Sequence, residues 1–159
     1  MFERFARDAR VIVTRAHEQA EALGSPTLEA EHMLLAIAAD PNTPTARLLS
    51  DEGLHSSGLL AALEREQELS LAAAGVTIGD FELPARPPVP RRKPGFAASS
   101  KRAMERAVRI AVARGDRRIG ATHVLLGVLR ADVGTVPRAL AAAGVDRIAL
   151  ATRAERSIG

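Results

Sequence analysis

An internal duplication constrains the fold of this chain more than any other feature. Residues 31–37 and 122–128 share the frame x-His-x-Leu-Leu-small-aliphatic and lie 91 residues apart. The same offset aligns residues 5–60 with residues 96–151 without a gap, and 15 of the 56 paired positions are identical. A long period without insertions indicates two copies of one structural unit rather than a short-period solenoid.

Apolar periodicity predicts four helices in each copy. The expected helices cover residues 7–23, 28–39, 44–53, 56–73, 99–115, 120–131, 136–143 and 146–157. The expected N-caps are Thr27, Thr43, Ser56 or Ser57, Thr135 and Asp146, and Ser99 or Ser100 is expected to start the fifth helix. Apolar residues make up 47% of the chain but aromatic residues only 3%, and this alanine- and leucine-rich composition favours packed helices over sheet. We therefore predict one all-α domain over 1–159, with repeat one at 1–74, a linker at 75–95 and repeat two at 96–159.

The segment between the copies is rich in proline and arginine. Residues 84–94 hold five prolines and four basic side chains, which predicts an extended spacer of polyproline type. An alternative function, nucleic-acid binding through this arginine-rich linker and the basic ends, would weaken steeply with salt. The net charge is only +3, acidic and basic residues are interspersed, and aromatic stacking residues are scarce. These features favour an ordinary mixed-charge surface.

The sequence contains no catalytic constellation. It has no cysteine, no Gly-rich phosphate-binding loop and no Gly-x-Ser-x-Gly nucleophile turn, so we expect no enzyme activity and no cofactor. His32 and His123 lie in amphipathic helices without carboxylates at metal-binding spacing, which predicts partly buried histidines bonded to backbone. A hydrolase or metal site at these two histidines is the alternative. The absence of a signal-like segment or a long apolar run predicts a cytoplasmic protein outside the membrane.

The motifs of the two copies resemble those of a known family. Residues 1–5 (Met-Phe-Glu-Arg-Phe), 28–36 and 119–127 are similar to the N-terminal domain of Clp AAA+ unfoldases, most closely the ClpC type, and the similarity covers essentially the whole chain. The resemblance implies two four-helix repeats related by a pseudo-twofold axis. It also implies a non-catalytic domain that receives substrates and adaptor proteins for an unfoldase–protease. Because the sequence has no Walker A motif, we expect either a free-standing relative of this domain or a fragment of an unfoldase. The long Pro/Arg-rich spacer and the changed phosphoarginine pockets favour a free-standing regulator or sequestering protein.

The resemblance also implies two candidate binding sites. In actinobacterial relatives, cyclic-peptide antibiotics bind across the starts of the two equivalent helices. The family residue type is kept at the matching positions Phe2, Arg10, Phe96, Lys101 and Glu105, whereas Thr14 and His17 depart from it. This surface is therefore our expected peptide site.

The second implied site is a pair of phosphoarginine pockets, each with a glutamate and a threonine. Carried over by position, the first pocket keeps Glu31 but has Ala6 in place of threonine, and the second has Thr122 and Ala97. Because charge-assisted contacts are strong, losing them predicts that phosphoarginine binds weakly or not at all. We expect at most a residual pocket at Glu31.

Overall fold

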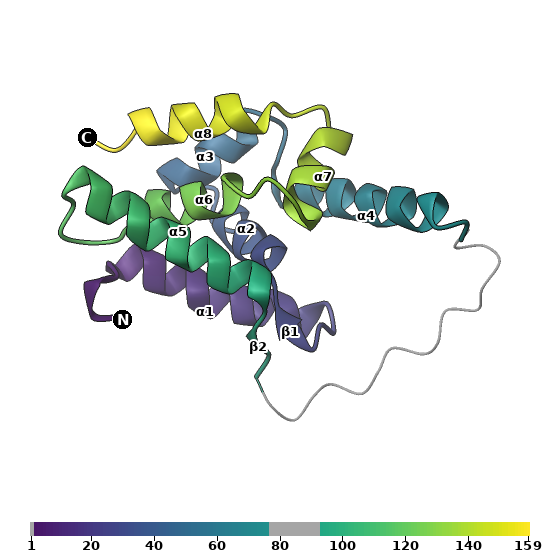
Figure 1. Cartoon of the computed structure of the whole chain (residues 1–159), viewed down its shortest axis with the longest axis horizontal. Helices are drawn as coiled ribbons and strands as arrows, with labels where there is room; N and C mark the ends of the chain where they lie inside the picture. The colour runs from purple at the N-terminus through teal and green to yellow at the C-terminus, as the bar shows by residue number, and fades with distance from the viewer. Residues whose placement is uncertain (1, 77–92) are drawn as a thin grey trace.

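A computed structural model describes residues 2–76 and 93–159 of the chain and confirms the all-α class (Figure 1). Most of the predicted Pro/Arg-rich linker, residues 77–92, lies outside this description. Repeat one contains the 3₁₀ turn η1 (Phe2–Arg4), α1 (Arg7–Ala22), β1 (Thr27–Leu28), α2 (Ala30–Ala38), α3 (Pro44–Ser50) and α4 (Ser56–Ala73). Repeat two contains β2 (Gly95–Phe96), α5 (Ala98–Arg114), α6 (Ala121–Leu129), α7 (Thr135–Ala142) and α8 (Arg147–Arg156).

All eight predicted helices are confirmed, but several predicted caps are wrong. Thr43 accepts a hydrogen bond from the backbone N–H of Ala46, and Asp146 accepts one from Ala149. Thr27, by contrast, lies in β1, and Thr135 is already the first residue of α7. The serines proposed to cap α4 also lie inside that helix, which begins after His55, and α5 begins at Ala98, one residue before the expected Ser99.

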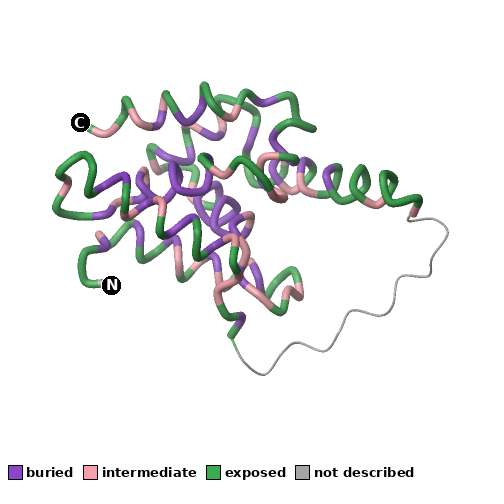
Figure 2. Tube along the Cα trace, viewed as in Figure 1, coloured by how far each residue is buried: buried purple, intermediate pink, exposed green. Residues whose placement is uncertain are grey.

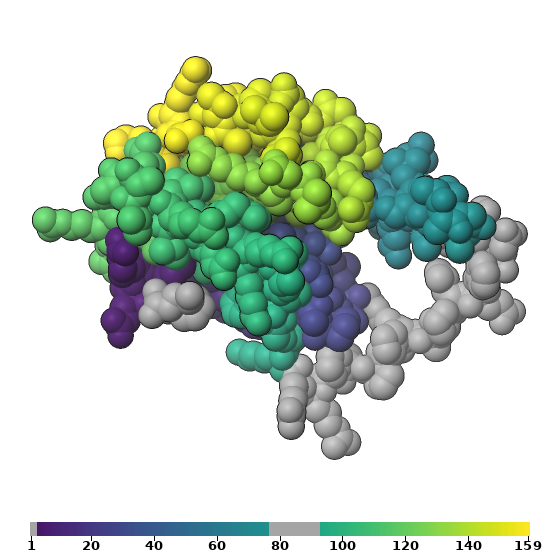
Figure 3. Space-filling model, in the orientation of Figure 1, coloured from purple at the N-terminus to yellow at the C-terminus, as the bar shows by residue number. Residues whose placement is uncertain are grey.

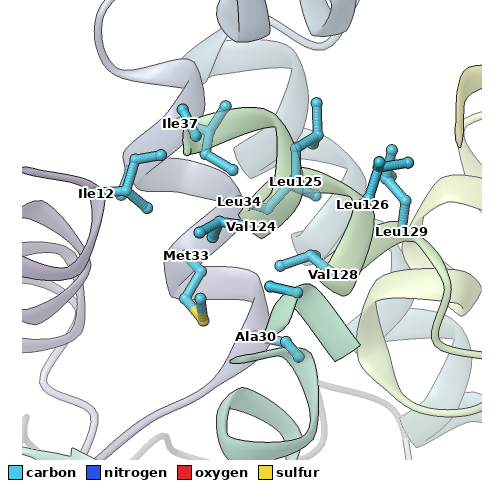
Figure 4. Packing of buried hydrophobic residues seen from close by; sticks show 14 of the residues in the cluster. Ile12, Ala30, Met33, Leu34, Ile37, Val124, Leu125, Leu126, Val128 and Leu129 are labelled. Carbon is cyan, nitrogen blue, oxygen red and sulfur yellow. The ribbon is translucent and has the colours of Figure 1, made fainter. Parts of the chain in front are cut away.

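The central helices α2 and α6 hold the two repeats together. Eight of the nine residues of α2 are buried, and so are eight of the nine of α6, so neither helix has a polar face (Figure 2). Leu34 and Leu125 lie where these helices pack against each other (Figure 4), and Leu126 of α6 is buried as well. The predicted burial of the Leu-Leu pairs is confirmed, since these residues and Leu35 are at most 2% exposed.

The two repeats also exchange backbone hydrogen bonds, which the sequence did not predict. Strand β1 of repeat one pairs in parallel with β2 of repeat two, and Phe5 forms the equivalent bridge with Ile119. The N–H of Ala97 donates to the Leu28 carbonyl at 2.9 Å, and the N–H of Ala6 donates to the Ile119 carbonyl at the same distance. The segment before each repeat's first helix is therefore anchored to the other repeat.

Ion pairs join the repeats on the opposite side of the core. Arg153 of α8 contacts Asp51 and Glu52 at the end of α3, at 2.9 and 2.7 Å. Arg138 of α7 contacts Glu66 of α4 at 2.9 Å. Figure 1 shows α8 beside α3 and α7 beside α4, while the end of α4 projects from the body. No helix in the described part of the chain is long and apolar enough to cross a membrane.

Candidate functional site

The expected peptide surface lies on α1 and α5, the equivalent first helices of the two repeats. Phe96 ends β2 and is half-buried, with one side packed against the core. Its ring meets the His17 ring of α1 edge-on, with centroids 5.6 Å apart and planes at 88°. His17 has no histidine counterpart in repeat two, and it departs from the family residue type at its position on this surface. The contact places an aromatic pair between α1 and the strand that precedes α5.

The charged members of this surface are exposed. Lys101 and Glu105 lie one turn apart on α5, and Glu105 forms an ion pair with Arg109 at 3.7 Å. Arg10, the repeat equivalent of Lys101, is exposed on α1. Phe2 begins η1, and its side chain is outside the described structure. The structure thus brings Phe96 and His17 together and sets Lys101 and Glu105 on the same helix face.

Glu31 lines a cavity of about 400 Å³ at a meeting point of three helix starts. The cavity lies between the first turns of α2, α5 and α7, so backbone N–H groups border it on three sides. The charged side chains that line the cavity are Glu29, Glu31, Arg102, Arg106, Asp132 and Arg138. We call this space the Glu31 cavity.

The predicted partnership of the pocket residues is wrong. Glu31 shares its cavity with Ala97 and Ser99 of repeat two, not with Ala6 of its own repeat. The cause is the exchange of strands, because β1 carries the start of α2 to the start of α5. A single sequence contains no signal for this exchange.

A second cavity of about 420 Å³ occupies the pseudo-symmetric place. It is lined by Arg7 and Asp8 from the start of α1 and by Ala121 from the start of α6. Deeper in the same cavity, Arg15 pairs with Asp40 at 3.4 Å. Thr122 occupies the position equivalent to Glu31, so α6 supplies no carboxylate here, and the acidic side chains that line this cavity are Asp8 and Asp40. The two cavities therefore differ in the origin of their carboxylates, because α2 supplies Glu31 to the first and α1 supplies Asp8 to the second.

Burial raises the pKa of the Glu31 carboxyl, and the nearby carboxylates of Glu29 and Glu66 raise it further. A backbone hydrogen bond and the charge of Arg138 oppose this rise in pKa. Glu29 is held differently, because the Thr27 hydroxyl donates to it at 3.0 Å and the Ser99 hydroxyl makes a short hydrogen bond to its other oxygen. Glu31 has no ion-pair partner among the described residues. Its carboxylate can therefore receive a cationic group in the cavity.

The two equivalent histidines are structural, as predicted, and more deeply buried than expected. His32 is 4% exposed, and its Nδ1 accepts the backbone N–H of Glu29 at 2.8 Å. His123 is 5% exposed and accepts the N–H of Gly120 at 2.9 Å, while its Nε2 contacts Asp116 at 2.8 Å. Each ring caps the start of its own helix. No group of three or more histidine, aspartate or glutamate side chains among the described residues could hold a metal ion.

Sequence reasoning missed the arginines of the Glu31 cavity. Arg102 and Arg106 follow each other by four residues on α5, and Arg109 follows Arg106 by three, which is the spacing of one helix face. The spacing of these arginines is visible in the sequence. That Arg102 and Arg106 share a cavity with Glu31 is not visible there, because their proximity depends on the contact between β1 and β2.

Both the sequence and the fold of this chain resemble those of known proteins. The model of the Clp repeat (R) N-terminal domain matches residues 4–82 and 95–159. The chain belongs to this Clp N-terminal domain family. ClpC2 of rice chloroplasts is 29% identical over all 159 residues, and ClpC1 of Arabidopsis chloroplasts is 28% identical over the same length. The chain spans only 16% and 15% of these two relatives.

Solved structures agree with this Clp N-terminal assignment at the level of the fold. The N-terminal domain of the Arabidopsis chaperone ClpD superposes with a TM-score of 0.67 at 22% identity, covering 98% of this chain and 95% of that one. The Hsp104 N-terminal domain of Candida albicans gives a TM-score of 0.69 at 19% identity, covering 99% and 94%. At such identities the likeness concerns the fold alone.

Proposed function

We propose that this Clp N-terminal domain is a non-catalytic binding module that receives protein substrates or adaptor proteins for a Clp unfoldase. The family match over both repeats supports the proposal, and the relatives are Clp chaperones and ATP-binding subunits of Clp proteases. A chain of this kind that acts on its own would sequester substrates, adaptors or peptide antibiotics without degrading them. Both proposed binding sites act through non-covalent contacts and require no reacting group.

The α1–α5 surface is our proposed site for apolar peptides, including cyclic-peptide antibiotics. One observation carries it: Phe96 is half-exposed and meets His17 edge-on between two otherwise charged helices. Aromatic anchors of this kind usually dominate the affinity of a peptide interface. Arg10, Lys101 and Glu105 then form a charged rim that orients the ligand, and Phe2 adds a second aromatic anchor.

A second candidate function rests on the Glu31 cavity. Its half-buried carboxylate has no ion-pair partner in the described structure, and the starts of α5 and α7 offer backbone N–H groups to an anion. We propose that the cavity takes an arginine-type cation, with phosphoarginine held only weakly because Ala97 supplies no hydroxyl. This candidate is separate from the aromatic site, so the two can be tested independently.

Isothermal titration calorimetry with a hydrophobic cyclic peptide and with free phosphoarginine tests both sites. Phe2→Ala is expected to weaken the cyclic peptide more than about tenfold, which is the effect of losing one anchor residue. Glu31→Gln should leave that binding unchanged, as should Leu69→Ala, a matched truncation of an exposed apolar side chain on α4. Tight phosphoarginine binding that Glu31→Gln abolishes, without any cyclic-peptide binding, would show that the aromatic surface is the wrong site.

A further inference from the structure

Charge is divided unequally between the two repeats. Residues 1–76 contain 6 basic and 12 acidic side chains, whereas residues 93–159 contain 13 basic and 5 acidic ones. The modest overall charge of +3 therefore hides an acidic first repeat and a basic second repeat. Because both repeats have the same fold, folding does not account for their opposite charges.

The largest contrast lies in the first helix of each repeat and the loop that follows it. Residues 98–118, which cover α5 and its loop, hold seven basic and two acidic side chains. The equivalent residues 7–27 hold three of each. Figure 3 shows α5 running across the front face of the molecule, where no other helix covers it. Because α1 makes the same fold without this charge, the fold does not require a basic helix.

Arg102, Arg106 and Arg109 form one face of α5, which we call the arginine face. The three residues span about 10 Å along the helix axis and lie roughly 80–140° around it from Lys101, with Arg109 about 40° from Glu105. Arg106 is anchored, since its Nε donates to the Gly127 carbonyl at 2.7 Å. Arg109 has only the exposed 3.7 Å pair with Glu105, and Arg102 has no ion pair among the described residues. The face therefore has cationic groups available for a partner.

These arginines are close enough to act on one another. Burial lowers the pKa of Arg106, and the positive charges of Arg109 and Arg102 lower it further. Like charges three and four residues apart oppose helix formation. The loop after α5 adds the exposed residues Arg117 and Arg118, neither of which has an ion pair in the described structure. An approaching anion relieves this repulsion.

We infer that the arginine face and the adjoining loop dock an acidic segment of a partner protein. Carboxylates at helical or extended spacing complement arginines that are themselves three and four residues apart. Val112, 57% exposed and one turn beyond Arg109, borders the arginine face on the side of Lys101 and Glu105, where a protein segment gains an apolar contact that a phosphate backbone would not use. Nucleic acid fits less well, because Glu105 and Asp116 interrupt the basic region and residues 98–118 contain no aromatic side chain. The Arg109–Glu105 ion pair joins the arginine face to the edge of the proposed peptide site, but the inference does not require that peptides bind there.

Fluorescence anisotropy with a labelled peptide of about 16 residues, rich in glutamate, aspartate and leucine, tests the inference; its length matches α5. Wild-type protein should bind the peptide and lose affinity as salt rises from about 50 to about 300 mM. The double variant Arg102→Glu/Arg109→Glu should weaken binding at least about tenfold, because two attractive contacts become repulsive. Both positions are exposed, and Arg106 is left in place, so the fold is kept.

The matched control is Arg47→Glu/Arg65→Glu, which changes the net charge equally at two exposed positions of repeat one. It should alter the affinity less than about twofold, since charges beyond a Debye length are screened. If both double variants lose the same affinity for the peptide, the effect depends on net charge alone and the inference is overturned. Tighter binding of a short DNA duplex or RNA than of the acidic peptide would also overturn it. So would self-association that disappears with Arg102→Glu/Arg109→Glu, because the partner would then be the acidic repeat of a second copy.

Discussion

Replacing His32 with alanine should lower the free energy of unfolding by about 2 kcal/mol at neutral pH. The ring is 4% exposed, and its Nδ1 accepts the Glu29 N–H at 2.8 Å. Loss of the cap acceptor accounts for about 1 kcal/mol. The orphaned N–H and the space left by the ring account for a similar amount. In a domain of this size that loss lowers Tm by roughly 4–8 °C, which thermal unfolding followed by circular dichroism can measure.

His32→Gln separates the cap from the packing. Glutamine at this helix position commonly accepts the N–H that His32 accepts here, but it carries no titrating proton. We expect it to recover about half of the loss caused by alanine. If glutamine and alanine lower Tm equally, the hydrogen bond to Glu29 contributes nothing and the histidine acts only by filling space.

The pH dependence of the same pair tests the protonation state of His32. Burial lowers the pKa of His32 below its ordinary value of 6.5, although the charge of Glu29 opposes this. Since the folded pKa lies below the unfolded one, the stability that neutral His32 contributes is present above 6.5 and is lost as the pH falls through the folded pKa. One group changes the free energy of unfolding by at most about 1.4 kcal/mol per pH unit. The advantage of wild type over His32→Gln should therefore shrink between about pH 7.5 and pH 5, and an advantage that grows toward acid pH would refute the assignment of a neutral cap.

Two further substitutions test other features of the core and the cavity. Because burial and the Glu29 carboxylate raise the pKa of Glu31, its contribution to stability is present below 4.5 and lost as the pH rises through the folded pKa. Glu31→Gln should therefore raise Tm by roughly a few degrees near pH 7 and by nothing near pH 4, whereas an unchanged Tm at both would show that the carboxylate is well solvated. Gly127→Ala should lower the free energy of unfolding by about 1–3 kcal/mol in urea denaturation, because its Cβ would lie 2.1 Å from the Ala103 carbonyl oxygen. The equivalent position in repeat one already carries Ala36, so a fully stable Gly127→Ala protein would mean that the two repeats pack alike.

The sequence predicted the elements of the fold well because local patterns determine them. Apolar spacing placed all eight helices, and the glycines at 24 and 115, both with positive φ, end the first helix of each repeat. The caps were less predictable, since Thr27 has the chemistry of a cap but was drawn into β1. There it donates to Glu29, and Glu29 itself becomes the residue before α2. Long-range strand pairing overrode the local preference.

The candidate sites depended on that same long-range pairing. Nothing local indicates that Glu31 faces Ala97 and Arg102, because these residues are joined only through the parallel contact of β1 with β2. The edge contact of His17 with Phe96 is equally non-local, and no local pattern around either residue predicts it. The sequence identified the residue types at the candidate sites, but it did not show which of these residues contact one another across the two repeats.

Because the chain contains two copies of one unit, a comparison of equivalent positions shows which charged residues the fold requires. Arg15 and Arg106 occupy equivalent positions, and each ties a first helix to its own repeat, through Asp40 and through the Gly127 carbonyl. A residue kept in both repeats for the same structural purpose is explained by folding. Arg102 and Glu31 fail this test, because α1 and α6 form the same helices with Val11 and Thr122 at the equivalent positions. Both of these unshared charges line a single cavity, so binding is expected on that side of the domain rather than at its pseudo-symmetric counterpart.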